Sequence, residues 1–236
     1  MTVATFGLLA VTIAIAAFVQ GSSGLGFALI STPVIGLVQP ELLPVAVLVL
    51  MVPLNIYVAG RERTGVEIRS AGWVTVGRLA GTAGGLAVLI AIPTSSLNLL
   101  VGGCTVLAAL ASLFAPSFTP GRSALATAGV VTGVTETATG VGGPPLALVY
   151  QHKPAHVLRS TVALCFLIGE VLSITLLLLT GEATMPQFVT AALLLPALGV
   201  GAILSHYVHH RLHGPRMRIA VLVFALVSGI ALLIGL

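Results

Sequence analysis

The stretch that organises this sequence is ETATGVGGPP, residues 136–145, where three glycines and two prolines fall within six positions. A related stretch, QGSSGLGF, occupies residues 20–27. A shift of 116 positions aligns Gln20 with Glu136, Gly24 with Gly140 and Gly26 with Gly142. Glycine adopts conformations that end a helix, and proline fits the first turn of the next one. Each stretch therefore predicts a break between two helical segments.

The composition around these breaks is that of a membrane protein. Of 236 residues, 57% are hydrophobic and 7% are charged, whereas an ordinary soluble domain has roughly 25% charged residues. A soluble fold has too little interior to bury so much apolar surface. We therefore expect an all-α integral membrane protein. The net charge of +4 comes from bases in short loops, which favours control of membrane topology over binding of nucleic acid.

Ten apolar segments are expected to form helices. A helix needs about 20 residues to span a bilayer, and the third, fourth, fifth, eighth, ninth and tenth segments reach that length. The other four form two short pairs, each joined by one glycine-rich break. The expected segments are 3–19, 26–38, 41–59, 70–92, 95–115, 123–136, 141–151, 156–180, 186–208 and 216–236.

The aligned breaks indicate a duplicated chain, with a first membrane repeat at 1–118 and a second at 119–236 in one compact transmembrane domain. Downstream, Pro40 aligns with Pro154 and Gly81 with Gly199. Five segments per repeat imply two inverted repeats, each opening with a broken or re-entrant helical hairpin. Nine of the ten bases lie after the third, fifth, seventh and ninth segments. The positive-inside rule places these connections in the cytoplasm and both termini outside it.

Non-helical backbone inside a membrane is tolerated where it lines a cavity or is buried in protein. Helix N-termini carry partial positive charge and attract anions, so the two breaks predict an anion site near the middle of the membrane. The alternative is that the glycines only allow tight helix packing. The predicted substrate-binding residues are Gln20, Gly21, Ser22, Ser23, Gly24, Gly26, Phe27, Thr137, Thr139, Gly140, Gly142, Gly143 and Pro144.

Two carboxylic acids lie within apolar segments and are candidates for proton coupling. Glu136 precedes the second break, and an acid in a membrane interior must be paired, protonated or hydrated. A structural hydrogen bond is the other interpretation. Glu170 aligns approximately with Asn55 and serves either as a proton relay, as a partner of Arg78 or in a structural role. Arg78 is expected to extend to the cytoplasmic interface or to attract the anion.

No cofactor and no metal centre are expected. The histidines at 206, 209, 210 and 213 lack supporting cysteines or acids and are interpreted as interfacial polar residues. Gln151, His152 and Arg159 are also expected at the interface, where a gating role is one interpretation.

The two motifs resemble those of the sulfite exporter TauE/SafE family. The residues that carry the resemblance are Gly21, Gly24, Gly26 and Pro33 in the first motif, and Gly140, Gly142, Gly143 and Pro144 in the second. The resemblance implies an inner-membrane permease of bacteria or archaea that moves sulfite, sulfonates or related anions, usually outward. The chain departs from the family's more typical Gly-Gly-Gly-Phe pattern at residues 143–145, and it carries serines at 22 and 23.

The sequence therefore predicts a multi-pass secondary transporter of the cell membrane that contacts the lipid bilayer and exports a small anion, such as sulfite, an organosulfonate or a related sulfur-containing anion. A passive anion channel is the first alternative. A membrane enzyme is the second, although the chain contains no aspartate and no common hydrolase motif. No nucleic-acid partner is expected, and a homo-oligomer is left open.

Overall fold

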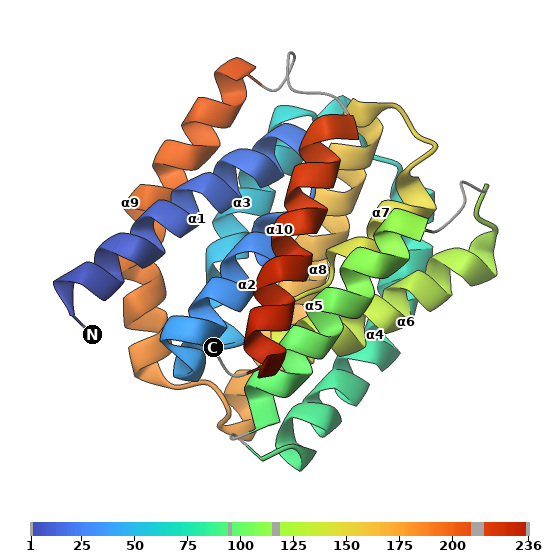
Figure 1. Cartoon of the computed structure of the whole chain (residues 1–236). Coiled ribbons are helices and arrows are strands. Elements are labelled where there is room, and N and C mark those ends of the chain that lie inside the picture. Colours follow the sequence, from blue (N-terminus) through green and yellow to red (C-terminus); the bar gives the residue numbers. More distant parts are fainter. Residues whose placement is uncertain (1, 94–95, 115–118, 209–214, 235–236) are drawn as a thin grey trace.

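The computed structural model describes residues 2–93, 96–114, 119–208 and 215–234, which form ten α-helices and two short 3₁₀-helices. Figure 1 shows their arrangement as a helical bundle. The helices are α1 (Val3–Ser23), α2 (Phe27–Val38), α3 (Val45–Arg61), α4 (Ile68–Ala91), α5 (Leu97–Phe114), α6 (Arg122–Thr139), α7 (Gly143–Tyr150), α8 (Ala155–Thr180), α9 (Met185–Val208) and α10 (Pro215–Ile234), with η1 (Pro40–Leu42) and η2 (Arg63–Gly65) on either side of α3.

All ten expected apolar segments form helices, and the all-α prediction is confirmed. Five helices, α1, α4, α5, α8 and α9, are long and apolar enough to cross a membrane. The prediction was wrong for the first segment, because α1 continues through residues 20–23 and reaches 21 residues. It was also wrong for the third, because residues 40–44 form a short 3₁₀-helix and a proline cap that leave α3 with 17 residues. The apolar part of α10 is shorter than a full span in the described residues.

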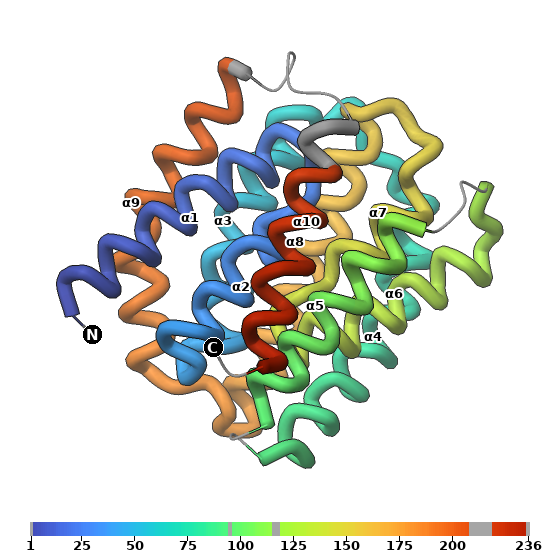
Figure 2. The backbone as a smooth tube through the Cα atoms, viewed as in Figure 1, coloured from blue at the N-terminus to red at the C-terminus, as the bar shows by residue number. Residues whose placement is uncertain are grey.

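Four close helix pairs build the bundle: α1 with α9, α4 with α6, α5 with α10, and α3 with α8. Figure 2 shows the α1–α9 pair on one side and the α4–α6 pair on the other. Between them, α3 packs against α9 and α8 packs against α4. Fully buried side chains such as Leu54 of α3 and Phe166 of α8 form the core, while large apolar side chains such as Leu179 and Val227 are exposed. This is the distribution expected where the outer surface faces lipid.

Glycines bring α4 and α6 into backbone contact. Gly77, Gly81 and Gly85 recur at four-residue intervals along α4 and therefore share one face. A Cβ atom added at Gly81 would collide with the backbone of Val130, and one added at Gly129 would collide with the backbone of Val74. Small residues at such spacing let membrane helices approach closely. The α4–α6 contact therefore has no room for side chains at these positions.

Charged connections gather at opposite ends of the bundle. At one end, Lys153 Nζ lies 2.6 Å from Glu67 Oε1, so the α7–α8 connection meets the start of α4. At the other, Gln187 donates a hydrogen bond of 2.8 Å to the carbonyl of Glu41. We call the first the basic end, defined by Arg61, Arg63, Arg69, Lys153 and Arg159, and the second the acidic end, defined by Glu41 and Glu182.

The α4–α6 contact predicts a position-specific loss of stability. Gly81→Ala should lower the free energy of unfolding by about 1–3 kcal/mol, the range for overpacked interiors, because its methyl group meets the Val130 backbone. Gly72→Ala is the matched control on the same helix, since nothing lies within 4 Å of its added Cβ. Thermal unfolding of both purified variants in detergent measures the difference. Equal melting temperatures would contradict the described contact.

Candidate functional site

The two glycine breaks end their helices in the same way. Gly24 caps α1 with φ 86°, and its N–H donates to the carbonyl of Gln20 at 2.7 Å. Gly140 caps α6 with φ 84°, and its N–H donates to the carbonyl of Glu136, also at 2.7 Å. A residue with positive φ reverses the chain at a helix C-terminus, and glycine adopts it without a steric penalty. The breaks therefore lie where the glycine motifs predict them.

A second helix starts within three residues of each reversal. Gly26, at φ 120°, precedes Phe27 and α2, while Gly142 precedes Gly143 and α7. Pro144 lies in the first turn of α7, where a missing N–H costs little. The breaks also approach one another, because a Cβ added at Gly143 would lie 3.5 Å from Cδ2 of Leu25. Two segments more than 100 residues apart in the chain thus meet.

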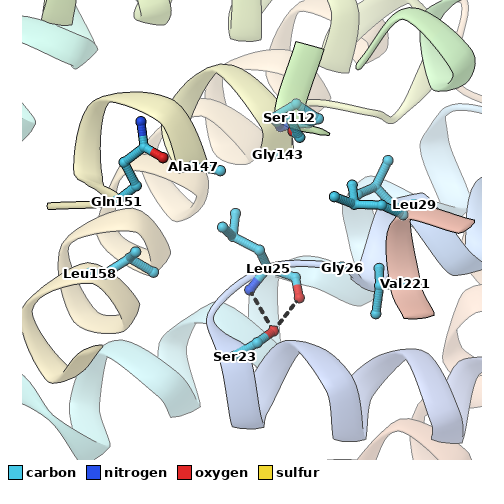
Figure 3. A pocket seen from close by; sticks show the side chains of 12 residues that line it. Ser23, Leu25, Gly26, Leu29, Ser112, Gly143, Ala147, Gln151, Leu158 and Val221 are labelled. Atoms are coloured by element: carbon cyan, nitrogen blue, oxygen red, sulfur yellow. Dashed lines mark hydrogen bonds between the residues drawn. The ribbon is translucent and has the colours of Figure 1, made fainter. Parts of the chain in front are cut away.

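A pocket of about 210 Å³ lies between the two breaks. Figure 3 shows Leu25 and Gly26 of the first break across the pocket from Gly143 of the second. Helices α2, α5, α7, α8 and α10 supply the rest of the wall. Its lining residues are Ser23, Leu25, Gly26, Leu29, Ser112, Gly143, Pro144, Ala147, Gln151, Leu158, Val221 and Leu222. The pocket is thus mainly aliphatic, with Ser23, Ser112 and Gln151 as its polar side chains.

Four of the predicted substrate-binding residues line this pocket: Ser23, Gly26, Gly143 and Pro144. The hydroxyl of Ser23 already holds the first turn, because its Oγ lies 2.5 Å from the Leu25 carbonyl and accepts the Leu25 N–H at 3.2 Å. The remaining predicted residues lie behind the pocket wall or in the backbone of the breaks. Their positions follow from hydrogen bonds that the sequence does not reveal.

Gln20 faces the start of α2. Its side-chain oxygen accepts the N–H of Phe27 at 3.1 Å, and its amide lies 3.4 Å from Oδ1 of Asn55. The backbone N–H of Phe27, one of the N–H groups that were expected to face an anion at a helix start, is therefore already hydrogen-bonded. Proline at 144 and 145 removes two more at the start of α7.

The hydroxyls of Thr137 and Thr139 make internal hydrogen bonds. Thr137 pairs with Ser173 at 2.7 Å, and Thr139 accepts the N–H of Val141 at 3.2 Å. Ser22 is fully buried, and its hydroxyl has no hydrogen-bond partner among the described residues. Gly21 packs against Ser205 of α9.

Arg78 and Glu136 form an ion pair in the interior of the bundle, and both side chains are fully buried. Arg78 also donates to the carbonyl of Cys165 at 3.2 Å. Its guanidinium occupies the space where Gly169 lacks a side chain. The expectation that Arg78 extends to the interface was therefore wrong, because the close α4–α6 contact holds it beside Glu136.

Glu170 belongs to a second polar chain. Asn55 donates to Glu170 Oε1 at 2.6 Å, and Asn55 also contacts Gln20. The ion-pair partner of Arg78 is Glu136 and not Glu170. Oε1 of Glu136 and Oε2 of Glu170 are buried and have no hydrogen-bond partner in the described part of the chain. Two intramembrane carboxyl groups and one guanidinium thus share the interior.

The structure adds polar residues that sequence reasoning missed. Thr132 donates to the carbonyl of Gly142 at 3.2 Å and so fixes the second break. Near the first break, Arg61 donates to the carbonyl of Gly21 at 2.6 Å. Glu62 pairs with Arg159, and the run Arg61-Glu62-Arg63 is the one signal for it, an acid between two bases.

No group of three or more potential metal ligands occurs among the described residues. Three of the four histidines considered above, His209, His210 and His213, lie outside those residues.

The family model for the sulfite exporter TauE/SafE family matches residues 9–232, nearly the whole chain. No curated protein and no solved structure matches the chain significantly.

The buried ion pair predicts a non-additive pair of substitutions. Arg78→Met should lower the free energy of unfolding by about 3–5 kcal/mol, because it leaves the Glu136 carboxylate buried without its partner. Adding Glu136→Leu should restore most of that loss. Arg122→Met is the control, since Arg122 is exposed and stacks on Trp73, a contact worth about 1 kcal/mol or less. Additive losses in thermal unfolding would contradict direct pairing.

Proposed function

The chain belongs to the sulfite exporter TauE/SafE family, and from this premise we propose that it exports sulfite, an organosulfonate or a related sulfur-containing anion. Members of this family are membrane transporters and not enzymes, and the chain is a multi-pass membrane protein. The observation that carries the proposal is the pocket enclosed by both glycine breaks.

The pocket suits a small anion with an apolar part. Its volume of about 210 Å³ lies below the roughly 300–1,000 Å³ of drug-sized ligand sites. Gln151 and Ser23 lie on opposite sides of the pocket (Figure 3) and are polar residues of its lining. Leu25 and Val221 add an aliphatic wall that favours a short carbon chain on the sulfur. The positive ends of α2 and α7 contribute their dipoles even where individual N–H groups are occupied.

The two halves act, in this proposal, as inverted repeats that exchange access to the pocket. The helix pairs support this arrangement. Each helix of one half has a counterpart five helices later in the chain, so that α1 corresponds to α6, α3 to α8 and α4 to α9. Under this correspondence the α4–α6 contact becomes the α9–α1 contact, and the α4–α8 contact becomes the α9–α3 contact. The α3–α8 and α5–α10 pairs convert into themselves, as expected for elements beside a pseudo-two-fold axis. The aligned residues Asn55 and Glu170 bond to one another, as two equivalent residues beside such an axis would.

The proposed orientation puts the basic end in the cytoplasm and both termini outside. The basic connections lie together at one end, as the positive-inside rule requires. Leu158 at the start of α8 and Gln151 at the end of α7 line the pocket, so the pocket lies toward the basic end. In this orientation the substrate is taken up from the cytoplasm.

In this proposal, anion transport is driven by protons that bind to and leave the interior carboxyl groups. With both carboxyl groups ionised, Arg78, Glu136 and Glu170 carry a net charge of −1, and one added proton makes the set neutral. These three side chains reach both breaks. Glu170 bonds to Asn55, and Asn55 contacts Gln20, which accepts the N–H at the start of α2. At the second break, a Cβ added at Gly142 would lie 2.8 Å from Glu136. A change of one charge there alters the attraction of the pocket for an anion.

Flux through liposomes tests the function. The purified protein, reconstituted with a sulfite gradient, should move sulfite and show counterflow, which a passive channel lacks. Ala147→Phe should reduce flux about tenfold or more, because its ring fills the pocket that Ala147 lines. Ala80→Phe, on the exposed face of α4, is the control. Unchanged flux in Ala147→Phe would show that the substrate bypasses this pocket.

The pH profile tests the coupling. Sulfite flux by the wild type should change at least about fivefold across a proton gradient, the range of a typical coupling energy. Glu136→Gln removes the charge that Arg78 pairs with and should leave flux nearly independent of the gradient. Glu67→Gln, at the basic end, should keep the wild-type profile. A Glu136→Gln variant with the full proton dependence would exclude this residue from coupling.

A further inference from the structure

A second charged cluster lies at the basic end, formed by Arg61, Glu62 and Arg159. Arg159 grips the carboxylate of Glu62 with two nitrogens: its Nε lies 3.0 and 2.9 Å from the two oxygens, and its Nη2 lies 2.6 Å from Oε1. Arg61 Nη2 lies 3.6 Å from the same Oε1. The three side chains are only 5–11% exposed. The cluster is therefore largely removed from water.

The charges of this cluster do not balance. Among the described residues, two guanidinium groups share one carboxylate, which gives these three side chains a net charge of +1 in a poorly hydrated place. The neighbouring pair of Lys153 and Glu67 is balanced within itself and supplies no spare anion. Nε of Arg61 is buried and has no hydrogen-bond partner among the described residues. A buried cation with an unused donor is costly unless an anion joins it.

The cluster adjoins the pocket without lining it. Arg61 holds the carbonyl of Gly21 in the first break. A Cβ added at Gly24 would lie 2.7 Å from Cγ of Arg159, and Leu158, the preceding residue, forms part of the pocket wall. An anion held by the two arginines would therefore be one side chain away from the pocket.

We infer that Arg61 and Arg159 form a second anion site, at the basic end, where an oxyanion exchanges with the carboxylate of Glu62 before it passes into the pocket. A sulfite or sulfonate group presents paired oxygens with negative charge, as a carboxylate does, and a guanidinium binds both in the same forked geometry. Glu62 occupies the site when no anion is present. The inference rests on the proposed function and adds a binding step to it.

A substitution at Glu62 distinguishes an anion-binding role of the cluster from a purely structural role. If the carboxylate competes with the incoming anion, Glu62→Gln removes the competitor and raises the net charge of the cluster from +1 to +2. The anion should then bind more tightly. If the cluster only holds the α3–α4 connection to α8, the same substitution weakens the fold and cannot improve binding.

Initial rates of sulfite transport, measured with the basic end facing the added sulfite, test the site. Glu62→Gln should lower the KM about fivefold, at the low end of typical coupling energies, because the competing carboxylate is removed, while the maximal rate stays within twofold of the wild type. Arg61→Gln, which leaves the bidentate pair of Arg159 and Glu62 in place, should raise the KM by a similar factor. Glu67→Gln is the matched control, because it breaks an ion pair at the same end that touches neither break. Its KM should equal that of the wild type.

Thermal stability in the presence of sulfite tests binding at the second site independently of transport rates. Sodium sulfite should still raise the melting temperature of Ala147→Phe in detergent, because its second site is intact although its pocket is filled. It should not do so for Ala147→Phe combined with Arg61→Gln, and sodium chloride at equal ionic strength is the control. A wild type that moves sulfite while Glu62→Gln or Arg61→Gln keeps an unchanged KM would overturn the second site alone. A wild type that moves no sulfur anion would overturn the proposed function itself.

Discussion

Backbone polar groups inside a membrane must find partners, and the two glycine breaks are the places where this chain interrupts its helices. At each break a glycine N–H returns to a carbonyl four residues earlier, so the reversal leaves little unsatisfied backbone. At the first break Gln20 also accepts the N–H that begins α2. Because the broken segments are enclosed by other helices, irregular backbone survives there, and the space between the breaks becomes a pocket rather than a lipid contact.

Two of the charged clusters in the described part of the chain are largely buried and have opposite imbalance. In the interior, Arg78 pairs with Glu136 while Glu170 bonds to Asn55, so that two carboxyl groups accompany one arginine. At the basic end, two arginines contact one carboxylate. The pocket lies near both. An anion site needs positive charge where the anion enters and negative charge farther along its path to release it. In the proposed orientation, the arginines at the basic end provide the first and the interior carboxyl groups provide the second. The apolar pocket wall between the clusters limits hydration and so strengthens their influence.

Much of the fold could be predicted because membrane helices have a strong local signal. The breaks at Gly24 and Gly140 followed from glycine, with proline as a further signal in the second break, and apolar runs located ten helices. The end of α1 did not follow, because residues 20–23 are not apolar yet stay helical, and Gln20, Gly21 and Ser22 are buried. Proline at 44 shortened α3 in a way that hydropathy does not register.

The candidate site was less predictable, because its contacts join distant segments. Arg78 and Glu136 are 58 residues apart, and a single sequence does not state that α4 packs on α6. The glycines at 77, 81 and 85 carried a usable signal for a close contact, although not for its partner. Gln20 could be placed near the break, but its turn toward Phe27 and Asn55 depends on α3 being adjacent.

The central claim is that an anion binds between the two glycine breaks. A crystal structure with selenite, a heavier relative of sulfite, tests it directly, because selenium can be located by its anomalous scattering. We expect a selenium peak in the pocket between Ser23 and Gly143, within reach of Gln151. A protein that transports sulfite but shows its selenium peak elsewhere, with this pocket empty, would contradict it.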